Sequence, residues 1–337
     1  MTTVMDLFRS DYNLEAEGHV GSPIARDILW RDGAGDNVLW LMNDTFDAPS
    51  TIVVIPFVPP DWHFKAGADF DGPGTHAQDS DILWQNDNGA LALWQMNGTS
   101  VTAIHALPNP GPTWHVVGNN DFNLDGRDDI LFQNDDGSVA IWTIASAATG
   151  TVSGMFAGIQ NPGPTWHPVG TGDTDGDSKA GILWQNTFGL FAGELVLWEN
   201  PTFSTFGFGT VTFNTVALLP TVDASWHVKG MADVNFDFHD DIVFQDDSGA
   251  VAIWEMGGAD GTTVTAMNLV NINPGPAWHV VSLSDLGGNG AILFEHDSGA
   301  LAWWAGYQSL GGGSATFTKV VAIDPNPNPN GHVWDLL

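Results

Sequence analysis

A long-period internal repeat constrains the fold of this 337-residue chain more than any other feature. Tryptophan is followed by histidine at positions 62, 114, 166, 226 and 278, so the steps are 52, 52, 60 and 52 residues. A unit of roughly 40 to 50 residues cannot bury its apolar face without its neighbours, so this periodicity predicts a radial or stacked repeat fold. The pairs are Trp62-His63, Trp114-His115, Trp166-His167, Trp226-His227 and Trp278-His279.

A second repeated element gives the number of units. It consists of Ile-Leu or Ile-Val followed by an aromatic residue, and a strand ending in Trp comes after it. Six copies are present, at 27–30, 81–84, 129–132, 181–184, 241–244 and 291–294.

The third copy indicates how one unit folds. Asp136-Gly137 predicts a tight hairpin turn, because glycine readily adopts the positive φ that such turns require. The prolines of 161–164 end the pairing, since proline cannot donate to a further ladder. The expected strands cover 114–118, 129–133, 139–144 and a segment from Val152 onward.

These units predict an all-β fold, a six-bladed β-propeller of four-stranded antiparallel blades, with a seven-bladed ring as the alternative. The whole chain, 1–337, is expected to form this single propeller. The approximate repeats are 1–58, 59–110, 111–162, 163–222, 223–274 and 275–330, followed by a closing strand at 331–337.

Ring closure has two possible explanations. Residues 333–337 resemble residues 4–8, and both segments stand where the first strand of a blade is expected. Either the C-terminal strand docks beside the N-terminal blade, or the two segments are equivalent points of a longer array. The first is favoured, because an open arc would leave two unpaired sheet edges.

Composition excludes several classes of partner and site. The chain carries 40 acidic and 8 basic residues, a net charge of −32, so duplex nucleic acid and anionic membranes are not expected to bind. It contains no cysteine, which rules out disulfides and thiolate metal sites. No long apolar run predicts membrane insertion, and residues 1–11 lack the layout of a signal peptide.

An acidic loop between the first two strands of a unit is the strongest functional signal. In the third copy, oxygen-bearing side chains recur at alternate positions, and a backbone carbonyl is available in between. Ca²⁺ takes six to eight oxygen ligands, so this pattern predicts a calcium site rather than a merely solvated turn. The ligands are expected from Asp121, Asn123, Asp125, the Arg127 carbonyl and Asp129, and in the fifth copy from Asp233, Asn235, Asp237, the His239 carbonyl and Asp241.

The other copies match this pattern less well. The fourth has Asp173, Asp175 and Asp177, but Gly181 stands at the position of the last acid. The second has a loop four residues longer and offers Asp69, Asp71 and Asp81. The first and sixth copies diverge and are expected to bind no ion.

The loop Asp-x-Asn-x-Asp-Gly-x-x-Asp, followed by Ile-Leu-Phe, resembles the FG-GAP/VCBS repeat of integrin-like and secreted bacterial propellers. The resemblance covers nearly the whole chain, and its Trp-rich form is similar to the bacterial extracellular branch. It implies Ca²⁺ in the first hairpin of a blade and an extracellular location. Phe238 in place of the loop glycine and Gly181 in place of the last acid depart from the pattern.

Ligand-binding residues are expected on the opposite turns and among unusual aromatics. The repeated tryptophans are interpreted as core, since packing between blades needs large apolar side chains. The repeated histidines lie on separate blades, too far apart to share one Zn²⁺. The candidates for ligand contact are Asn86, Asp87, Asn134, Asp135, Trp303 and Tyr307.

No catalytic motif is present in the sequence, so we expect a binding module rather than an enzyme. A glycan is the preferred ligand of this lectin-like or adhesin-like, secreted, Ca²⁺-dependent monomer. A structural or protein-binding adhesion module on cell surfaces is the alternative, and a polysaccharide-acting enzyme comes third.

Overall fold

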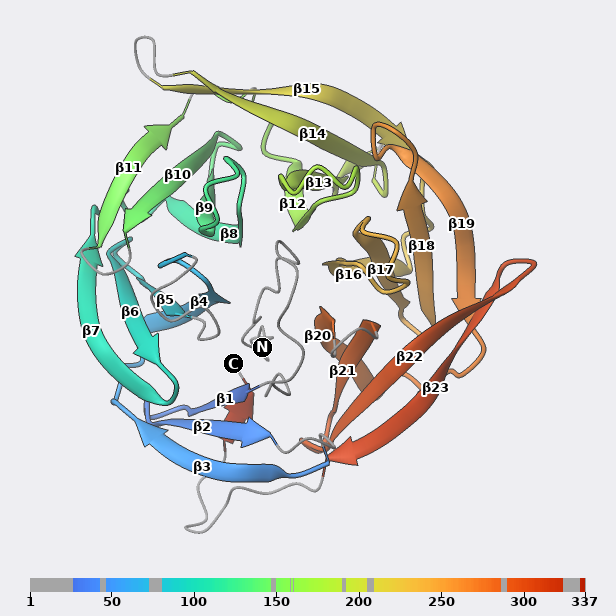
Figure 1. The fold of residues 1–337 in the computed structure, drawn as a ribbon, viewed down its shortest axis with the longest axis horizontal. Coiled ribbons are helices and arrows are strands. Elements are labelled where there is room, and N and C mark those ends of the chain that lie inside the picture. Colours follow the sequence, from blue (N-terminus) through green and yellow to red (C-terminus); the bar gives the residue numbers. More distant parts are fainter. Residues whose placement is uncertain are drawn as a thin grey trace, which may run out of the picture.

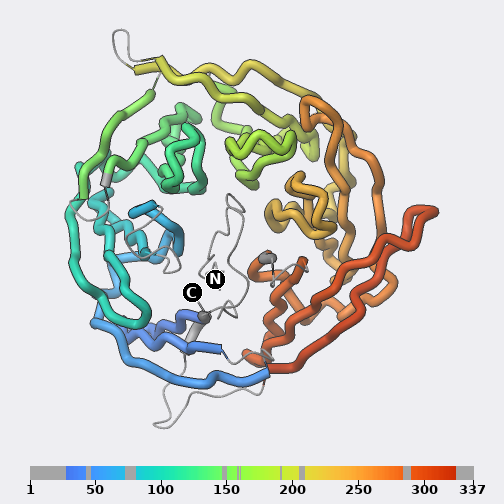
Figure 2. The backbone as a smooth tube through the Cα atoms, viewed as in Figure 1, coloured from blue at the N-terminus to red at the C-terminus, as the bar shows by residue number. Residues whose placement is uncertain are grey.

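The computed structural model is all-β and is described here for residues 27–42, 47–72, 81–146, 150–157, 159, 161–189, 192–204, 209–285, 290–323 and 334–336. These residues contain no α-helix, and hence none long and apolar enough to span a membrane. Repeated four-stranded antiparallel sheets stand around a common axis, as in a β-propeller (Figures 1 and 2).

Three of the sheets follow the order expected from one sequence repeat; the first adds the C-terminal strand, and the last combines two repeats. Four sheets have four strands, and the fifth has eight. The first is built from β1 (Asp27–Asp32), β2 (Asn37–Met42), β3 (Pro49–Ile55) and the C-terminal β24 (Trp334–Leu336); the second from β4 (Trp62–Ala68), β5 (Asp81–Asn86), β6 (Leu91–Asn97) and β7 (Ser100–Leu107); the third from β8 (Trp114–Asn120), β9 (Asp129–Asn134), β10 (Val139–Ser146) and β11 (Thr151–Phe156). The fourth has β12 (Trp166–Gly172), β13 (Gly181–Asn186), β14 (Leu195–Ser204) and β15 (Thr210–Leu219). The eight-stranded sheet has β16 (Trp226–Ala232), β17 (Asp241–Asp246), β18 (Val251–Gly257), β19 (Thr263–Val270), β20 (Trp278–Asp285), β21 (Gly290–His296), β22 (Leu301–Gly311) and β23 (Ser314–Ile323).

The eight-stranded sheet consists of two antiparallel halves, β16–β19 and β20–β23. They meet through a short parallel pairing of β19 with β23, at Leu269 with Ser314 and Val270 with Ala315. The long β22–β23 hairpin reaches this contact from the outside of the ring (Figure 1).

The ends of the ring meet through strand pairing and packing. Strand β24 pairs antiparallel with β1, and Arg31 is opposite Asp335. One apolar cluster joins both sides of this junction, with Ile28 and Trp40 from the first sheet and Leu293 and Trp303 from β21 and β22. The equivalent N-terminal segment 4–8 lies outside the described residues.

Aromatic pairs fill the sheets, as expected from their ten-residue spacing. Phe132 and Trp142 pack with ring centroids 4.8 Å apart, and Phe244 and Trp254 at 4.7 Å. The expectation of an exposed Trp303 is wrong, because its side chain is 0% exposed. Neighbouring residues of β22 point to opposite faces of the sheet. Trp303 therefore packs in the junction with the first sheet, while Trp304 packs on Phe294 with ring centroids 4.5 Å apart.

The fourth sheet has a longer outer hairpin than the first three sheets. Strands β14 and β15 each have ten residues, and the paired ends of the two strands reach toward β11 of the preceding sheet (Figure 1). Phe203 of this hairpin packs edge-on against Phe156 at 4.9 Å. Asn200 has φ 59°, and the pairing of β14 with β15 is interrupted there, although the register is the same on both sides. This interruption lies next to Glu199, a residue of the candidate site.

Candidate metal centre

The acidic loops connect the innermost strand of a sheet to the second strand. In the third sheet, Asp121 organises the loop from its first position. Its Oδ1 accepts backbone N–H bonds from Asn123, Leu124 and Asp125 at 3.2, 2.7 and 3.2 Å. Its Oδ2 accepts the N–H of Gly126 at 2.8 Å. The carboxylate therefore folds the loop around itself.

The loops of the fourth and fifth sheets repeat this geometry. Asp173 Oδ1 accepts from Asp175, Gly176 and Asp177, and its Oδ2 from Ser178 at 2.7 Å. Asp233 Oδ1 accepts from Phe236 and Asp237, and its Oδ2 from Phe238 at 2.9 Å. The three loops thus adopt the same turn, although their sequences differ at the majority of positions.

Positive φ at two loop positions is part of this turn. In the third sheet Leu124 has φ 62° and Gly126 has φ 77°. In the fifth sheet Phe236 and Phe238 have φ 64° and 68°. Phe238, which departs from the resembled pattern, therefore keeps its conformation although side chains disfavour it. Residues held in this strained region are typical of functional sites.

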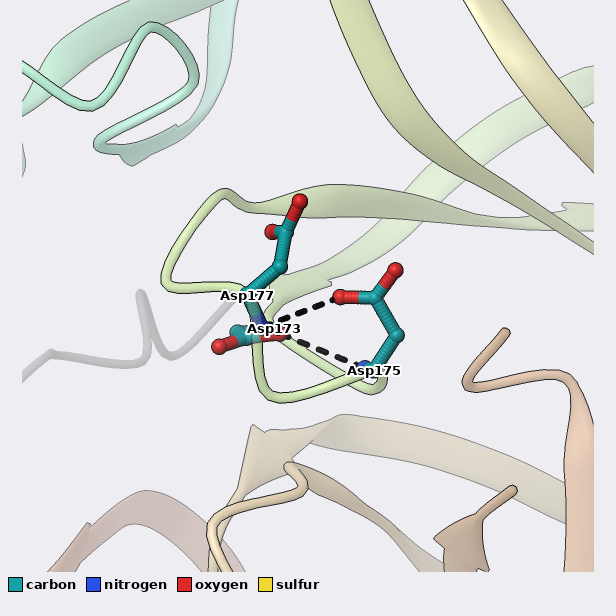
Figure 3. A group of neighbouring side chains, drawn as sticks. All are labelled: Asp173, Asp175 and Asp177. Atoms are coloured by element: carbon teal, nitrogen blue, oxygen red, sulfur yellow. Dashed lines mark hydrogen bonds between the residues drawn. The ribbon is translucent and has the colours of Figure 1, made fainter. Parts of the chain in front are cut away.

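The fourth loop brings three carboxylates together. Ligand oxygens of Asp173, Asp175 and Asp177 all lie within 4.8 Å of one another (Figure 3). Mutual repulsion of this kind is relieved by a bound cation or by protonation. Burial, followed by the neighbouring carboxylates, raises the pKa of Asp173 to about 6, against the opposing effect of its backbone hydrogen bonds.

The loops of the third and fifth sheets have an amide in the middle position. Asn123 Nδ2 donates to Asp125 Oδ2 at 3.3 Å, and Asn235 Nδ2 donates to Asp237 Oδ2 at 3.1 Å. The Asn123 Oδ1 atom is buried and has no hydrogen-bond partner. A buried acceptor without a donor is a position where a cation would be favourable.

The last acid of the pattern starts the second strand. Asp81, Asp129 and Asp241 are each 0% exposed. One oxygen of each accepts a backbone N–H of the third strand, from Met96, Ile144 and Met256 respectively. The second oxygens of Asp81 and Asp129 have no partner. Burial raises the pKa of Asp129 and of Asp241 to about 9, and that of Asp81 to about 8.

Glu199 was not predicted from the sequence as a site residue. It lies on β14, is 0% exposed, and accepts a hydrogen bond from Thr174 Oγ1 at 2.6 Å through Oε1. A Cβ atom added at Gly181 would lie 2.2 Å from Glu199 Oε2 and 2.3 Å from Oε1. The Glu199 carboxylate therefore occupies the space of the acid that is missing at Gly181.

Neighbouring acidic loops are hydrogen-bonded to each other through the residues at their first and eighth positions. Asp128 N donates to Asp69 O at 2.7 Å, and Asp69 N donates to Asp128 Oδ2 at 3.0 Å. Asp240 makes the same two bonds with Asp173, at 2.6 and 2.9 Å. Between the third and fourth loops, where Ala180 replaces this acid, only the Ala180 N–H bond to Asp121 O can form. These hydrogen bonds position the first acid of the second, third and fourth loops.

The remaining predicted ligands are those of the second copy and the two backbone carbonyls. In the second copy, Asp69 Oδ1 accepts the N–H of Gly72 at 2.7 Å, and Asp71 is hydrogen-bonded to Gln95. Residues 73–80 of that loop lie outside the described residues. The carbonyls of Arg127 and His239 stay predicted ligands, and the His239 ring also bonds to Thr174 O at 2.7 Å, which links two loops.

The opposite face carries the predicted ligand-binding residues. Asp87 and Asp135 are exposed and accept hydrogen bonds from His63 and His115 at 2.7 Å. The same pair recurs as His227 with Asp247 and His279 with Asp297. Each repeated histidine of these pairs thus bonds within its own sheet.

Two predicted contact residues have structural roles. Asn86 is buried and donates to Asp61 Oδ2 at 2.9 Å, so it holds a turn. Tyr307 is half-buried, donates to Glu255 at 2.8 Å and accepts from Asn268 at 2.9 Å. Neither is available as a freely exposed contact.

The innermost strand of the fourth sheet, β12, differs from the other innermost strands in its hydrogen bonds to the preceding sheet. Gln85 Oε1 and Gln245 Oε1 accept the N–H of Val116 and Val280 across sheet junctions. Pro168 stands at the equivalent position and has no N–H. Gln133 Oε1 instead accepts from His167 Nδ1 at 3.1 Å.

A pocket of about 290 Å³ lies beside this altered junction. His115, Asn134, Asp135 and His167 contribute polar groups to its wall. Because β8 begins at this face and ends at the acidic loop, the pocket and the metal loops lie on opposite faces.

Comparisons with known proteins leave the family open. No protein-family model matches the chain, and no curated protein matches it. One solved structure, the "Crystal Structure of Mitotic Checkpoint Complex", is similar to it with a TM-score of 0.43 and 13% identity, over 95% of this chain and 85% of that chain.

Proposed function

We propose that this chain is a non-enzymatic, Ca²⁺-stabilised binding module of the FG-GAP/VCBS kind. The observation that carries the proposal is the shared loop geometry, in which Asp121, Asp173 and Asp233 each cap a turn of alternating oxygen ligands.

The donor set fits Ca²⁺. All side-chain ligands of the three loops carry oxygen, which suits a hard cation. The chain has no cysteine, so it offers no thiolate ligand for a softer metal. Asn123 Oδ1 and Asp129 Oδ2 are buried acceptors without donors, as expected of metal ligands. Asp121, Asn123, Asp125 and Asp129 would hold the ion in the third sheet. The bound ion would neutralise their charge and stabilise the folded ring by mass action.

The ring is proposed to have six blades rather than seven. Four sheets of four strands, plus the two halves of the eight-stranded sheet, give six four-stranded units in the described part of the chain. β24 would then close the ring as the innermost strand of the first blade.

A glycan is the proposed ligand, and the pocket beside His167 is its proposed site. Its volume is near the lower limit of small-molecule pockets, which favours one sugar unit over a long chain. Its hydroxyl-binding groups come from His115, Asn134 and Asp135. The exposed Asp87 with His63 offers a related but simpler site on another blade.

A protein partner is the second candidate. Val216 and Leu218 on the outer strand β15 are 61% and 70% exposed, and Val54 on β3 is 77% exposed. Such apolar side chains on the ring's outer surface favour adhesion to a protein over binding of a sugar.

We further propose an extracellular monomer. Weak oxygen sites of extracellular modules are saturated at millimolar Ca²⁺ and would be empty in the cytosol. A charge of −32 also favours a monomer in solution through self-repulsion.

A glycan array probed in Ca²⁺ and again in chelator tests this function. We expect binding in Ca²⁺ that Asp135→Ala abolishes and that Asp297→Ala, in the matched pair of the last unit, leaves intact. Silence across the array would contradict the glycan proposal and favour a protein partner.

A further inference from the structure

Two residues of the fourth unit's acidic loop change together, and both contact a glutamate of the third strand. Gly181 replaces the last acid, Thr174 replaces the buried apolar residue seen as Phe122 and Val234, and Glu199 follows the repeat tryptophan Trp198. The structure places all three in contact, since Thr174 donates to Glu199 and the Gly181 Cβ position overlaps the Glu199 carboxylate. The glycine therefore makes room for a carboxylate from another strand.

The second oxygen of this carboxylate has no partner. Glu199 is 0% exposed, and Oε2 forms no hydrogen bond. Thr174, which donates to Glu199, stands between Asp173 and Asp175 in the loop, so the carboxylate lies beside the three-acid cluster. A buried, unsatisfied carboxylate beside three others is unfavourable in its ionised form unless a cation is bound.

We propose that Glu199 is the fourth carboxylate ligand of the fourth-unit loop and makes it the tightest Ca²⁺ site of this chain. The inference rests on the proposed calcium function and concerns which site is strongest. The fourth loop then has Asp173, Asp175, Asp177 and Glu199, which are four carboxylates. The third loop has Asp121, Asp125 and Asp129 with an amide from Asn123, and the fifth has the same composition. More ligand charge raises Ca²⁺ affinity.

Two consecutive residues of β14 contact the loop. Asn200, with its positive φ, donates through Nδ2 to Asp175 Oδ2 at 2.8 Å. Glu199 accepts from Thr174, so this part of β14 is fixed against the loop. At the equivalent strand position of the third unit, Thr143 is hydrogen-bonded to Ser153 and makes no such contact.

Titration calorimetry of the whole metal-free chain with Ca²⁺ tests this proposal. We expect Glu199→Gln to weaken the tightest binding event by ~10-fold or more, the loss typical of a disturbed metal site. Glu255→Gln is the matched control, because Glu255 holds the same strand position in the fifth unit but bonds to Tyr307 and Asn268. It should leave the tightest event unchanged.

A second variant distinguishes the loss of a Ca²⁺ ligand from misfolding of the loop. Gly181→Asp combined with Glu199→Thr moves the fourth carboxylate to the position that Asp129 holds in the third unit and keeps four carboxylates in the loop, so the tightest binding event should be retained. If Glu199→Gln leaves every binding event unchanged, Glu199 is not a ligand, although the calcium function stands. If the unaltered chain binds no Ca²⁺, both proposals fail.

Discussion

The acidic loops of the third and fourth units have one backbone geometry but take their last carboxylate from different strands. In the third unit Asp129 comes from the start of the second strand; in the fourth Glu199 comes from the third strand, across a glycine. Both carboxylates are 0% exposed and have one oxygen without a partner. The difference teaches that the site is defined by a position in space, which two different strands can fill.

Removal of Ca²⁺ is expected to have the largest effect on both loops. At a Ca²⁺ concentration 100 times Kd, each site contributes about 2.7 kcal/mol to the free energy of unfolding. Thermal melting in Ca²⁺ and in chelator should therefore give clearly separated midpoints. Coincident midpoints would contradict calcium binding at either loop.

Asp173→Ala and Asp177→Ala should separate turn formation from ion binding in the fourth loop. Asp173 accepts four backbone N–H bonds, so its loss should cost about 2 kcal/mol even in chelator. Asp177 accepts only the Lys179 N–H from the backbone, so its loss should matter mainly in Ca²⁺. Denaturant unfolding under both conditions measures this, and equal effects in chelator would show that Asp173 is no more than a ligand.

Asp125→Ala with Asp237→Ala is the parallel test for the third and fifth loops. These substitutions should remove most of the chelator effect of those two loops and leave the fourth loop intact. Calorimetry should then retain the single tightest Ca²⁺ event. Its loss would place the tight site elsewhere and break the comparison between the units.

The stability of the metal-free protein should fall as pH rises. Burial raises the folded-state pKa of Asp129, Asp241 and Glu199 to about 9, above their ordinary carboxyl values. The folded state therefore binds more protons than the unfolded state, and this stability is lost between pH ~4 and pH ~9. Saturating Ca²⁺ holds the carboxylates ionised, so the decline should disappear. Denaturant midpoints across this pH range, with and without Ca²⁺, provide the measurement, and a metal-free stability that rises with pH would contradict the account.

Asp135→Ala should have the smallest effect on stability. The His115–Asp135 pair is exposed, and such pairs contribute up to about 1 kcal/mol. Ligand binding at the pocket should nevertheless be lost, while Ca²⁺ binding on the opposite face stays unchanged. A parallel loss of Ca²⁺ affinity would show that the two faces are coupled.

Much of the fold follows from local sequence patterns. The Trp-His strands, the Asp-Gly turns and the ten-residue aromatic spacing are short-range signals, and the four-stranded sheets follow from them. The turn around Asp121 is likewise encoded within six residues, so its loop was predictable. Trp303 was interpreted wrongly because two adjacent tryptophans share one strand, and only the junction with the first sheet shows that both are buried.

Glu199 shows what such patterns leave out. It lies 18 residues after Gly181, and the pairing of β13 with β14, which places Ile182 opposite Trp198, brings the two residues together. The signal that was available is the combination of Thr174, Gly181 and Glu199, since the fifth unit has Glu255 at the strand position but keeps Asp241. In the same way, the pocket beside His167 depends on Pro168, whose missing N–H redirects Gln133.

A crystal structure of the protein with Tb³⁺ in place of Ca²⁺ tests the central claim most directly. The account predicts anomalous peaks in the loops 121–129, 173–181 and 233–241, with the fourth-unit ion about 2.3 to 2.6 Å from oxygens of Asp173, Asp175, Asp177 and Glu199. Loops without a peak, or a fourth-unit ion with Glu199 turned away from it, would contradict the account.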